Sequence, residues 1–164
     1  MASDRSGVSR DEFIELVERY NVELLRLAVA MARDARLAED AVQATWQKAW
    51  ATRESIRERD RVAGWLFTIT ANEVRRQLRR QRLGRILQAR LSEPRRPEAP
   101  GPQRVDLGSA LDALSVEDRQ LVGLRFGIGL TSEEIAPLLG LSGPGVRRRL
   151  QRVLARLRAD LGDD

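Results

Sequence analysis

Residues 131–157 read TSEEIAPLLGLSGPGVRRRLQRVLARL. Thr131 and Glu134 are spaced to form a capping box, in which each side chain bonds a free backbone N–H group at the start of a helix. Gly140 suits the left-handed residue that ends such a helix, and Ser142 can cap the next one. The stretch therefore predicts a short helix, a tight turn and a longer second helix.

The second of these helices has two chemically different faces. Val146, Leu150 and Val153 recur at helical spacing and are expected to point inward. The start of the helix and its opposite face carry side chains suited to base edges and phosphates, and these are the predicted DNA-binding residues: Ser142, Arg147, Arg148, Gln151 and Arg152. The pattern predicts a helix-turn-helix DNA-binding motif. An ordinary helical hairpin with a solvated arginine face is the alternative.

Three longer helical patterns precede this motif. Ser9 and Glu12 form a capping box, after which an apolar stripe begins at Phe13. Asp34 can cap a second helix, and a third begins at Val62 after a charged loop. The expected apolar stripe of the second helix is Ala38, Ala41, Val42, Thr45 and Ala49.

Helical periodicity stops between Leu91 and Val105, where four prolines and a glycine lie. Proline removes a backbone donor and disfavours helix in the residue before it, so this segment is expected to be a semi-rigid linker. Beyond it, Gly127 and Gly129 are expected to break a helix that carries an apolar stripe ending at Phe126. We expect an all-α fold of two small helical domains, 9–90 and 106–162, joined by the Pro-rich linker 91–105, with the helix-turn-helix in the second domain.

The composition argues against catalysis and metal binding. The chain of 164 residues has no Cys and no His, which removes thiol chemistry, zinc sites built on those residues and the commonest general base. We therefore expect no catalytic residue, no metal and no cofactor. No signal peptide is visible, and the longest apolar stretch is too short to span a bilayer, so a cytoplasmic protein without membrane insertion is expected.

The charge is segregated along the chain. Residues 11–60 contain eleven acids and eight bases, whereas residues 75–96 contain nine arginines and one acid. Residues 147–158 contain six arginines and no acid. A single arginine run is usually a solvated helix face, but two runs in two domains favour nucleic-acid binding, because each phosphate contact releases counterions.

Several motifs resemble those of a known family. The stretch AEDAVQATW at 38–46 resembles the helix by which bacterial sigma factors bind core RNA polymerase. The stretch GWLFTITAN at 64–72 resembles the promoter-melting helix of that family, and 114–119 with 134–142 match its C-terminal domain. The chain resembles the extracytoplasmic-function (ECF) sigma factors from about Phe13 to Leu161, with the linker unmatched.

The resemblance implies a promoter-specificity factor that binds core RNA polymerase and directs transcription initiation. Promoter DNA and a separate anti-sigma factor are the further partners that it implies. The polar face of the second helix would bind core polymerase through Glu39, Asp40, Gln43 and Gln47. The third helix would meet the −10 promoter region through Asn72, Arg75, Arg76, Arg79 and Arg80. The loop 52–61 would capture a flipped base, and the last helix would contact the −35 element.

Three positions depart from the family pattern. Arg76 stands where the family usually has an acid, which makes the third helix more basic. Pro144 and Gly145 replace the usual Gly-Thr at the start of the last helix, and Pro137 falls inside the preceding helix. We hypothesise that the upstream element is recognised weakly, and that threonine at position 145 would tighten binding to it.

Two other readings remain open from the sequence. The first is a helix-turn-helix regulator that binds duplex DNA alone and never acts with polymerase. The second is a sigma-like interaction protein that sequesters an anti-sigma factor, or that occupies polymerase without initiating. Paired carboxylates such as Glu133 and Glu134 are the best argument for an enzyme, but favourable charge at a helix N-terminus explains them equally well.

Overall fold

The computed structural model describes residues 7–56, 59–91 and 106–162. Within these ranges the chain forms helices and no strands, so the all-α expectation is confirmed. In chain order the elements are α1 (Arg10–Ala32), α2 (Ala35–Thr52), η1 (Arg53–Ser55), η2 (Arg59–Arg61), α3 (Val62–Leu91), α4 (Leu107–Asp112), α5 (Val116–Val122), η3 (Gly123–Ile128), α6 (Ser132–Leu139) and α7 (Gly143–Leu161).

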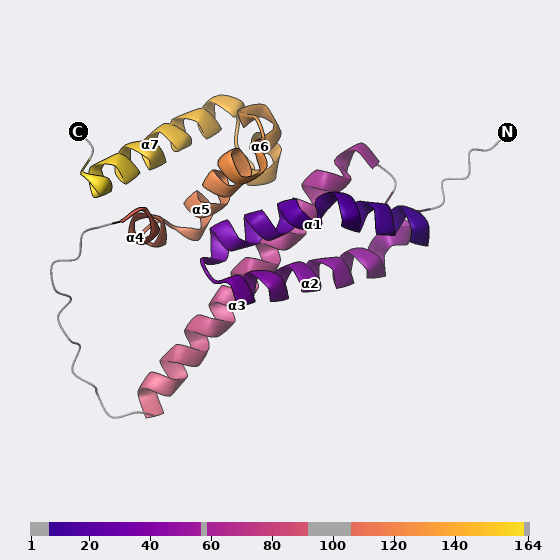
Figure 1. Cartoon of the computed structure of the whole chain (residues 1–164), viewed down its shortest axis with the longest axis horizontal. Coiled ribbons are helices and arrows are strands. Elements are labelled where there is room, and N and C mark those ends of the chain that lie inside the picture. Colours follow the sequence, from indigo (N-terminus) through magenta and orange to yellow (C-terminus); the bar gives the residue numbers. More distant parts are fainter. Residues whose placement is uncertain (1–6, 57–58, 92–105, 163–164) are drawn as a thin grey trace.

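Helices α1, α2 and α3 form the first packed unit. Helices α1 and α2 lie side by side, and α3 crosses them and runs on beyond their ends (Figure 1). Both predicted caps are present: Ser9 and Glu12 form the capping box of α1, and the Asp34 carboxylate accepts the Leu37 N–H at 2.9 Å. The whole predicted apolar stripe of α2 is buried. These local signals therefore fix the start and the inward face of each helix.

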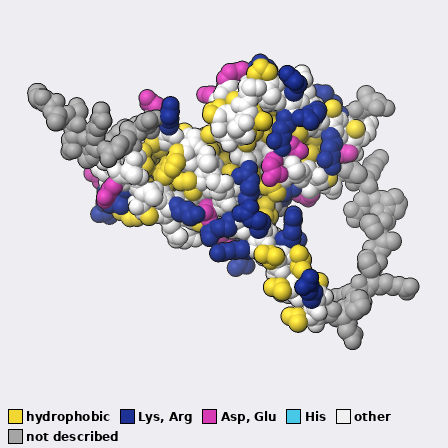
Figure 2. Space-filling view, turned by 180° about the vertical axis from the view of Figure 1, so that it is seen from behind, with side chains coloured by type: hydrophobic (Ala, Val, Ile, Leu, Met, Phe, Trp, Pro, Cys, Tyr) yellow, Lys and Arg dark blue, Asp and Glu magenta, His cyan; other side chains and the backbone are white. Residues whose placement is uncertain are grey.

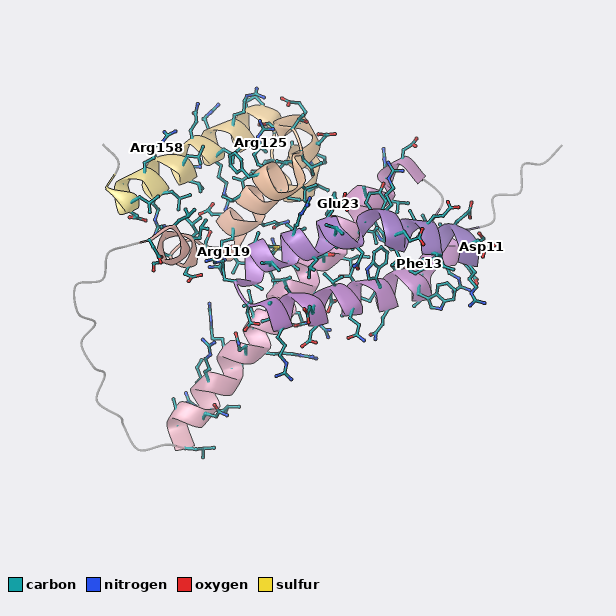
Figure 3. The ribbon with its side chains drawn as sticks, in the orientation of Figure 1. Asp11, Phe13, Glu23, Arg119, Arg125 and Arg158 are labelled. Carbon is teal, nitrogen blue, oxygen red and sulfur yellow. The ribbon has the colours of Figure 1, made fainter. Side chains whose placement is uncertain are left out.

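The inward side of α1 supplies three of the largest fully buried side chains of the core. Leu24, Leu27 and Met31 are completely buried. Burying an aliphatic side chain of this size contributes about 1.5–3 kcal/mol relative to leaving it exposed. Near the other end of α1, Phe13 lies between α1 and α2 (Figure 3), and its ring meets that of Trp46 edge-on with centroids 5.7 Å apart.

Helices α4 to α7 form a second unit, which packs directly on α1. Helix α5 and the π-helical segment η3 lie along the C-terminal half of α1, and buried residues of both units belong to one hydrophobic core. Gly123 makes this contact close, because a Cβ there would lie 2.9 Å from Ala30 Cβ. A second close approach joins α3 to α6, where a Cβ on Gly64 would lie 3.1 Å from Leu138 Cδ2.

Polar contacts reinforce the same interface. Arg119 of α5 donates from Nε to the Met31 carbonyl at the end of α1, at 2.8 Å (Figure 3). Arg33, the residue that ends α1 with φ 57°, donates from Nε to Asp112 Oδ1 at 2.9 Å. Burial lowers the pKa of Arg119 below its ordinary value, but this guanidinium remains protonated at neutral pH. The end of α1 is therefore bound by side chains from both sides of the interface.

Two sequence expectations for the second unit are wrong. Gly127 does not break its helix, since α5 continues through η3 and the chain turns only at Gly129, with φ 90°. Phe126 is 60% exposed, whereas Leu121 and Leu124 are buried, so Phe126 is not part of the inward stripe. In α4, Leu107 at the N-terminus is exposed and Ala110 is buried.

The prolines of the second half fall in two different settings. Pro137 lies inside α6 on its exposed face, and the helix continues to Leu139. The predicted linker of 91–105 begins at the last residue of α3, but 92–105 lie outside the described residues. The linker and the domain boundaries drawn from it therefore stay predictions, while the two units that it was expected to separate share one core.

We predict that Gly123→Val lowers the free energy of unfolding by about 1–3 kcal/mol, since its side chain must push α5 and η3 away from α1. Urea unfolding followed by circular dichroism measures the change. Gly84→Val is the matched control, because no atom lies within 4 Å of a Cβ at this helical glycine. An equal effect of both substitutions would mean that the close approach at Gly123 does not stabilise the fold.

Candidate nucleic-acid interface

The helix-turn-helix forms with the caps that the sequence predicts. Thr131 and Glu134 make a capping box at α6, and Gly140 ends that helix in the left-handed conformation with φ 64°. The Ser142 hydroxyl accepts the Gly145 N–H at 3.2 Å and so caps α7. The Glu134 carboxylate accepts hydrogen bonds from the Thr131 backbone N–H and from its hydroxyl, and these lower the pKa of Glu134 below its ordinary value of 4.5. The Thr131 and Glu134 pair therefore works as a capping box.

Helix α7 separates its two faces as expected. The inward residues Val146, Leu150 and Val153 are buried. The predicted DNA-contacting side chains are all exposed: Arg147, Arg148, Gln151 and Arg152. Lys and Arg side chains gather over the C-terminal helices and the middle of the molecule on the face that Figure 2 shows. The geometry therefore leaves a basic helix face open to a ligand.

Some arginines of α7 bond to other helices, and others form no ion pair within the described ranges. Arg149 donates from Nε to Asp118 Oδ1 of α5 at 2.8 Å, and Arg156 donates to the Ala113 carbonyl at 3.1 Å. Arg147 bonds Glu133 of α6, and this bond lowers the pKa of that carboxyl below 4.5. In the described part of the chain, Arg148 and Arg152 form no ion pair.

The N-terminal half of the arginine run on α3 is also partly engaged. Asn72, Arg79 and Arg80 are exposed, as a DNA-contacting role requires. Arg75 is half-buried and donates from Nη2 to Gln120 Oε1 of α5, with Glu117 of the same helix 3.8 Å from its Nε. The structure thus joins a predicted DNA-binding residue of the first unit to the second unit.

Arg76 has a partner that the sequence reading missed. Glu73 is 1% exposed and accepts from Arg76 Nη2 at 2.6 Å and from Nζ of Lys48, the only lysine of the chain. Burial raises the pKa of Glu73, but the hydrogen bonds from Lys48 and Arg76 outweigh it and hold the pKa below 4.5. The charge of Arg76 is therefore offset by Glu73, which a count along the chain does not reveal. The sequence did contain a signal that Glu73 is buried, because it lies next to Val74 on the inward side of the predicted third helix.

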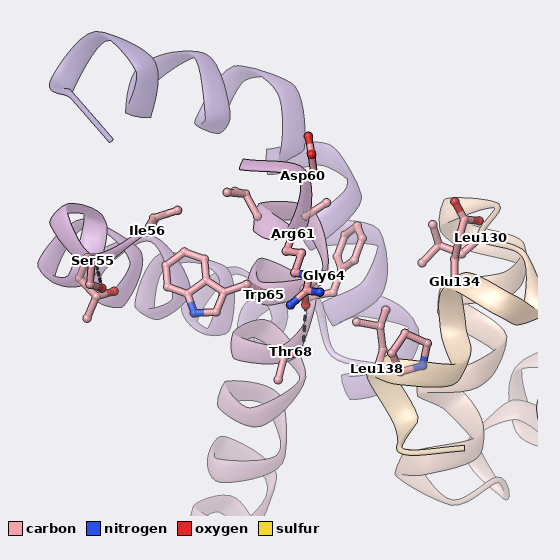
Figure 4. A pocket seen from close by; sticks show the side chains of 15 residues that line it. Ser55, Ile56, Asp60, Arg61, Gly64, Trp65, Thr68, Leu130, Glu134 and Leu138 are labelled. Atoms are coloured by element: carbon pink, nitrogen blue, oxygen red, sulfur yellow. Dashed lines mark hydrogen bonds between the residues drawn. The ribbon is translucent and has the colours of Figure 1, made fainter. Parts of the chain in front are cut away.

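A cleft of about 1140 Å³ lies between the loop after α2, the start of α3 and helix α6. Ile56 and Trp65 line one side of it and Leu138 the other, while Asp60 and Arg61 lie at its edge (Figure 4). This is the place of the predicted base-capturing loop, of which residues 57–58 lie outside the described ranges. In this arrangement α6 covers one side of the cleft.

The polar face of α2 is fully presented to solvent. The predicted polymerase-binding side chains are all exposed: Glu39, Asp40, Gln43 and Gln47. Within the described residues these four side chains form no hydrogen bond or ion pair. They lie opposite the buried stripe that packs on α1 and α3. The face is thus free to bind a partner without disturbing the core.

Comparison with known proteins shows which family has both of these units. The model of Sigma-70 region 2 matches residues 16–83, and that of Sigma-70 region 4 matches residues 110–159. The RNA polymerase sigma factor CarQ of Myxococcus xanthus is 32% identical over 161 residues, covering 94% of this chain and 92% of CarQ. The ECF RNA polymerase sigma factor SigL of Mycobacterium tuberculosis is 30% identical, covering 89% of this chain and 86% of SigL. The chain is an ECF sigma factor.

Solved structures agree with this family. CnrH, solved in complex with the cytosolic domain of CnrY, has a TM-score of 0.70 and 29% identity, covering 95% of this chain and 91% of CnrH. The sigma factor RpoE of Bartonella quintana, solved in complex with the anti-sigma factor NepR, has a TM-score of 0.67 and 29% identity. The match covers 92% of this chain and 98% of RpoE. The two regions of the ECF sigma factor described here correspond to the two packed units.

The remaining surface chemistry of this sigma factor is simple. Among the described residues no group of three or more acidic side chains is placed to hold a metal ion. No helix in the described ranges combines the length and apolar character needed to cross a membrane. Of the candidate binding surfaces, the α2 face and most of the α3 arginines lie in region 2, and α7 lies in region 4.

We predict that Glu73→Gln destabilises the sigma factor by about 1–3 kcal/mol at neutral pH, because Lys48 and Arg76 lose their counter-charge. A lowered carboxyl pKa stabilises the fold above the ordinary value of 4.5, and this contribution is lost as the pH falls through the lowered value.

Thermal unfolding from neutral pH to below pH 4.5 measures both effects. The wild type should lose stability more steeply than Glu73→Gln over the acidic part of the range, so that the two curves converge. Glu39→Gln, at an exposed site, is the control and should match the wild type. Parallel curves for the wild type and Glu73→Gln would contradict the assignment.

Proposed function

We propose that this ECF sigma factor binds core RNA polymerase through the exposed α2 face and directs initiation at promoters through α3 and α7. The observation that carries the proposal is the separation of these surfaces. An acid- and amide-bearing face lies on one helix, and two arginine-bearing faces lie on two others. A protein that must hold polymerase and DNA at once needs such distinct surfaces.

The α2 face is suited to a protein partner. Glu39, Asp40, Gln43 and Gln47 lie within three turns of one helix, and their side chains need no internal bond to be broken before binding. The match of Sigma-70 region 2 covers this helix. Hydrogen-bonding side chains on a rigid helix give orientation to a complex, which initiation at a defined start site requires.

The DNA contacts on α7 are assigned by which arginines the fold leaves free. Arg149 and Arg156 position α7 on α5 and on the end of α4, so their loss would act through the fold. Arg148 and Arg152 are exposed and have the reach for base edges and phosphates. Gly145 adds no side chain there, and a Cβ at this site would lie 3.1 Å from the capping Ser142 Oγ. Threonine at position 145 therefore needs a small shift of that hydroxyl before it can add a DNA contact.

The contact between Arg75 and Gln120 bears on how the factor engages DNA. If Arg75 contacts the promoter, its bonds to Gln120 and Glu117 of region 4 have to break. We infer that region 4 moves away from region 2 when the sigma factor joins polymerase and promoter. The bonds of Arg119 and Arg33 to the other unit would break in the same step.

The factor is proposed to act without catalysis of its own, in the cytoplasm, where its polymerase partner works. An independent regulator that binds duplex DNA alone remains the alternative function, favoured only by the helix-turn-helix itself. A sequestering role without initiation differs from initiation in one respect, namely that core polymerase is bound but no transcript starts.

We predict that the purified protein, added to sigma-free bacterial core polymerase and sheared genomic DNA, produces transcripts with defined start sites. Asp40→Ala combined with Gln43→Ala should abolish them, because both exposed side chains lie on the proposed polymerase contact. Glu15→Ala combined with Glu18→Ala, on an exposed face of α1, is the matched control and should keep them.

The same assay separates the alternatives. Core polymerase that is bound without transcripts would support the sequestering role. A protein that binds no core polymerase but shifts duplex DNA alone would establish the independent regulator and reject the proposal.

We predict that Arg148→Ala combined with Arg152→Ala weakens binding of the holoenzyme to a promoter found in that assay by at least about tenfold. Fluorescence anisotropy with a labelled promoter fragment measures the affinity. If a lost contact is to phosphate, the slope of affinity against salt should also fall by about one per contact. Arg158→Ala, which removes charge from the last turn of the same helix, should change affinity little. Equal losses in both variants would reject specific contacts at Arg148 and Arg152.

A further inference from the structure

The C-terminal part of α3 carries an apolar face without a partner. Leu83 and Leu87 are each 60% exposed, Ile86 is 45% exposed and Leu91 is 89% exposed. These side chains appear as the hydrophobic surface on the part of the molecule that projects away from the packed units (Figure 2). Beyond Leu78, every described residue of α3 is exposed. Over these three turns, none of the four aliphatic side chains is buried against another element of the described ranges.

The four aliphatic side chains form one stripe. At 100° per residue, Leu83, Ile86, Leu87 and Leu91 fall within an arc of about 140° around the helix axis. This width is typical of a helix that packs on another helix along one side. A solvated helix face would instead carry polar residues at these spacings. The stripe is therefore shaped for a helical partner.

Arginines accompany the stripe and no acid does. Residues 74–91 contain no acidic residue. The exposed arginines along the stripe and beside it are Arg79, Arg80, Arg82 and Arg90. A second copy of this helix would bring like charges together, which disfavours self-association through the stripe. An acidic partner has the complementary charge.

The undescribed parts of the printed sequence do not supply that partner. Residues 92–105 contain four prolines and have Ala99 and Val105 as their only other apolar residues. Residues 1–6, 57–58 and 163–164 are too short for an amphipathic helix of several turns. None of these printed segments therefore offers an acidic amphipathic helix to the stripe.

We propose that the surface formed by Leu83, Ile86, Leu87 and Leu91 binds an acidic amphipathic helix of a separate protein. Leucine-type side chains of that helix would pack on the stripe, and flanking carboxylates would pair with the arginines. Burial of the aliphatic side chains supplies the affinity, and the charges supply partner choice and association rate. The surface lies apart from the α2 face, so binding here does not depend on the proposed polymerase contact.

DNA is the competing occupant, since the same arginines can contact phosphates. The aliphatic side chains decide between the two, because phosphates and sugars offer nothing to bury four leucine-sized groups against. Promoter contact through Arg79 and Arg80 therefore leaves the stripe unexplained, whereas an acidic amphipathic helix uses both chemistries.

A labelled synthetic helix tests the proposal on the 164-residue protein. The probe is a peptide of about 18 residues, or five turns, with a leucine stripe flanked by glutamates. A scrambled peptide of the same composition is the control probe. Fluorescence anisotropy should give binding at least about tenfold tighter for the amphipathic probe, and weaker binding at high salt. Leu83→Gln combined with Leu87→Gln should weaken it by at least about tenfold.

Two variants guard the interpretation. Gln81→Ala combined with Ala89→Gln changes the opposite side of the helix and should leave binding unchanged. Leu83→Gln combined with Leu87→Gln should keep the thermal unfolding of the wild type, because both side chains are exposed.

Three results would overturn the proposal. One is equal binding of both peptides, or full binding by the leucine variant. Another is self-association of the wild type in sedimentation equilibrium that the leucine variant abolishes, which would assign the stripe to a second copy. The third is loss of duplex DNA binding in the leucine variant without any peptide binding. None of them depends on transcription, so the proposed function can fail or stand independently.

Discussion

The close packing of α5 and η3 on α1 is the constraint on which the rest of this structure depends. It is possible because Gly123 has no side chain, so that the two helices meet at the Cβ of Ala30. Once they meet, Leu121 and Leu124 join Leu24 and Leu27 in a single hydrophobic core. The position of α6 over the cleft and of α7 relative to α3 both follow from this contact.

The same contact explains why the arginines of this chain have different roles. Arg119 and Arg33 bind carbonyl and carboxylate groups across the interface, and Arg149 holds α7 in place. Only arginines without such partners, among them Arg148 and Arg152, are available to a ligand without structural loss. Arg75 belongs to neither set of arginines. It is bonded to Gln120 while the two regions are packed together, and it becomes available to a ligand when they separate. The partner of each arginine therefore indicates whether it can bind a ligand, which the net charge of the chain does not.

The sequence predicts the parts of the fold that are decided locally. Caps at Ser9, Asp34, Thr131 and Ser142 are correct because a hydroxyl or carboxylate needs only the next helical turn to act. The exposed faces of α2 and α7 are correct because helical spacing and burial in one core agree. The family resemblance, and with it the type of function, was also available from short motifs in the right order.

What the sequence does not predict depends on contacts between distant segments. Glu73 is an unremarked acid until α2 and α3 bring Lys48 beside it, 25 residues away along the chain. Phe126 is apolar, yet it lies on the outer side of the π-helical segment and is 60% exposed, while Leu121 and Leu124 are buried in the core shared with α1. The glycine at 123 has no local signal, since its role comes from a helix about ninety residues earlier. The sequence pattern predicts two separate domains joined by a linker. The core that the two units share depends on how their surfaces fit together, which a pattern along one segment does not show.

The central claim is that the free sigma factor holds its two regions together and that promoter binding separates them. The chain has no cysteine, so Glu15→Cys on α1 and Ala155→Cys on α7 place spin labels at two exposed sites only. Double electron–electron resonance then measures their separation in the free protein and in the complex with core polymerase and promoter. The account predicts one narrow, short distance distribution in the free protein and a clearly longer one in the complex. A broad, long distribution in the free protein, or an unchanged distance in the complex, would contradict it.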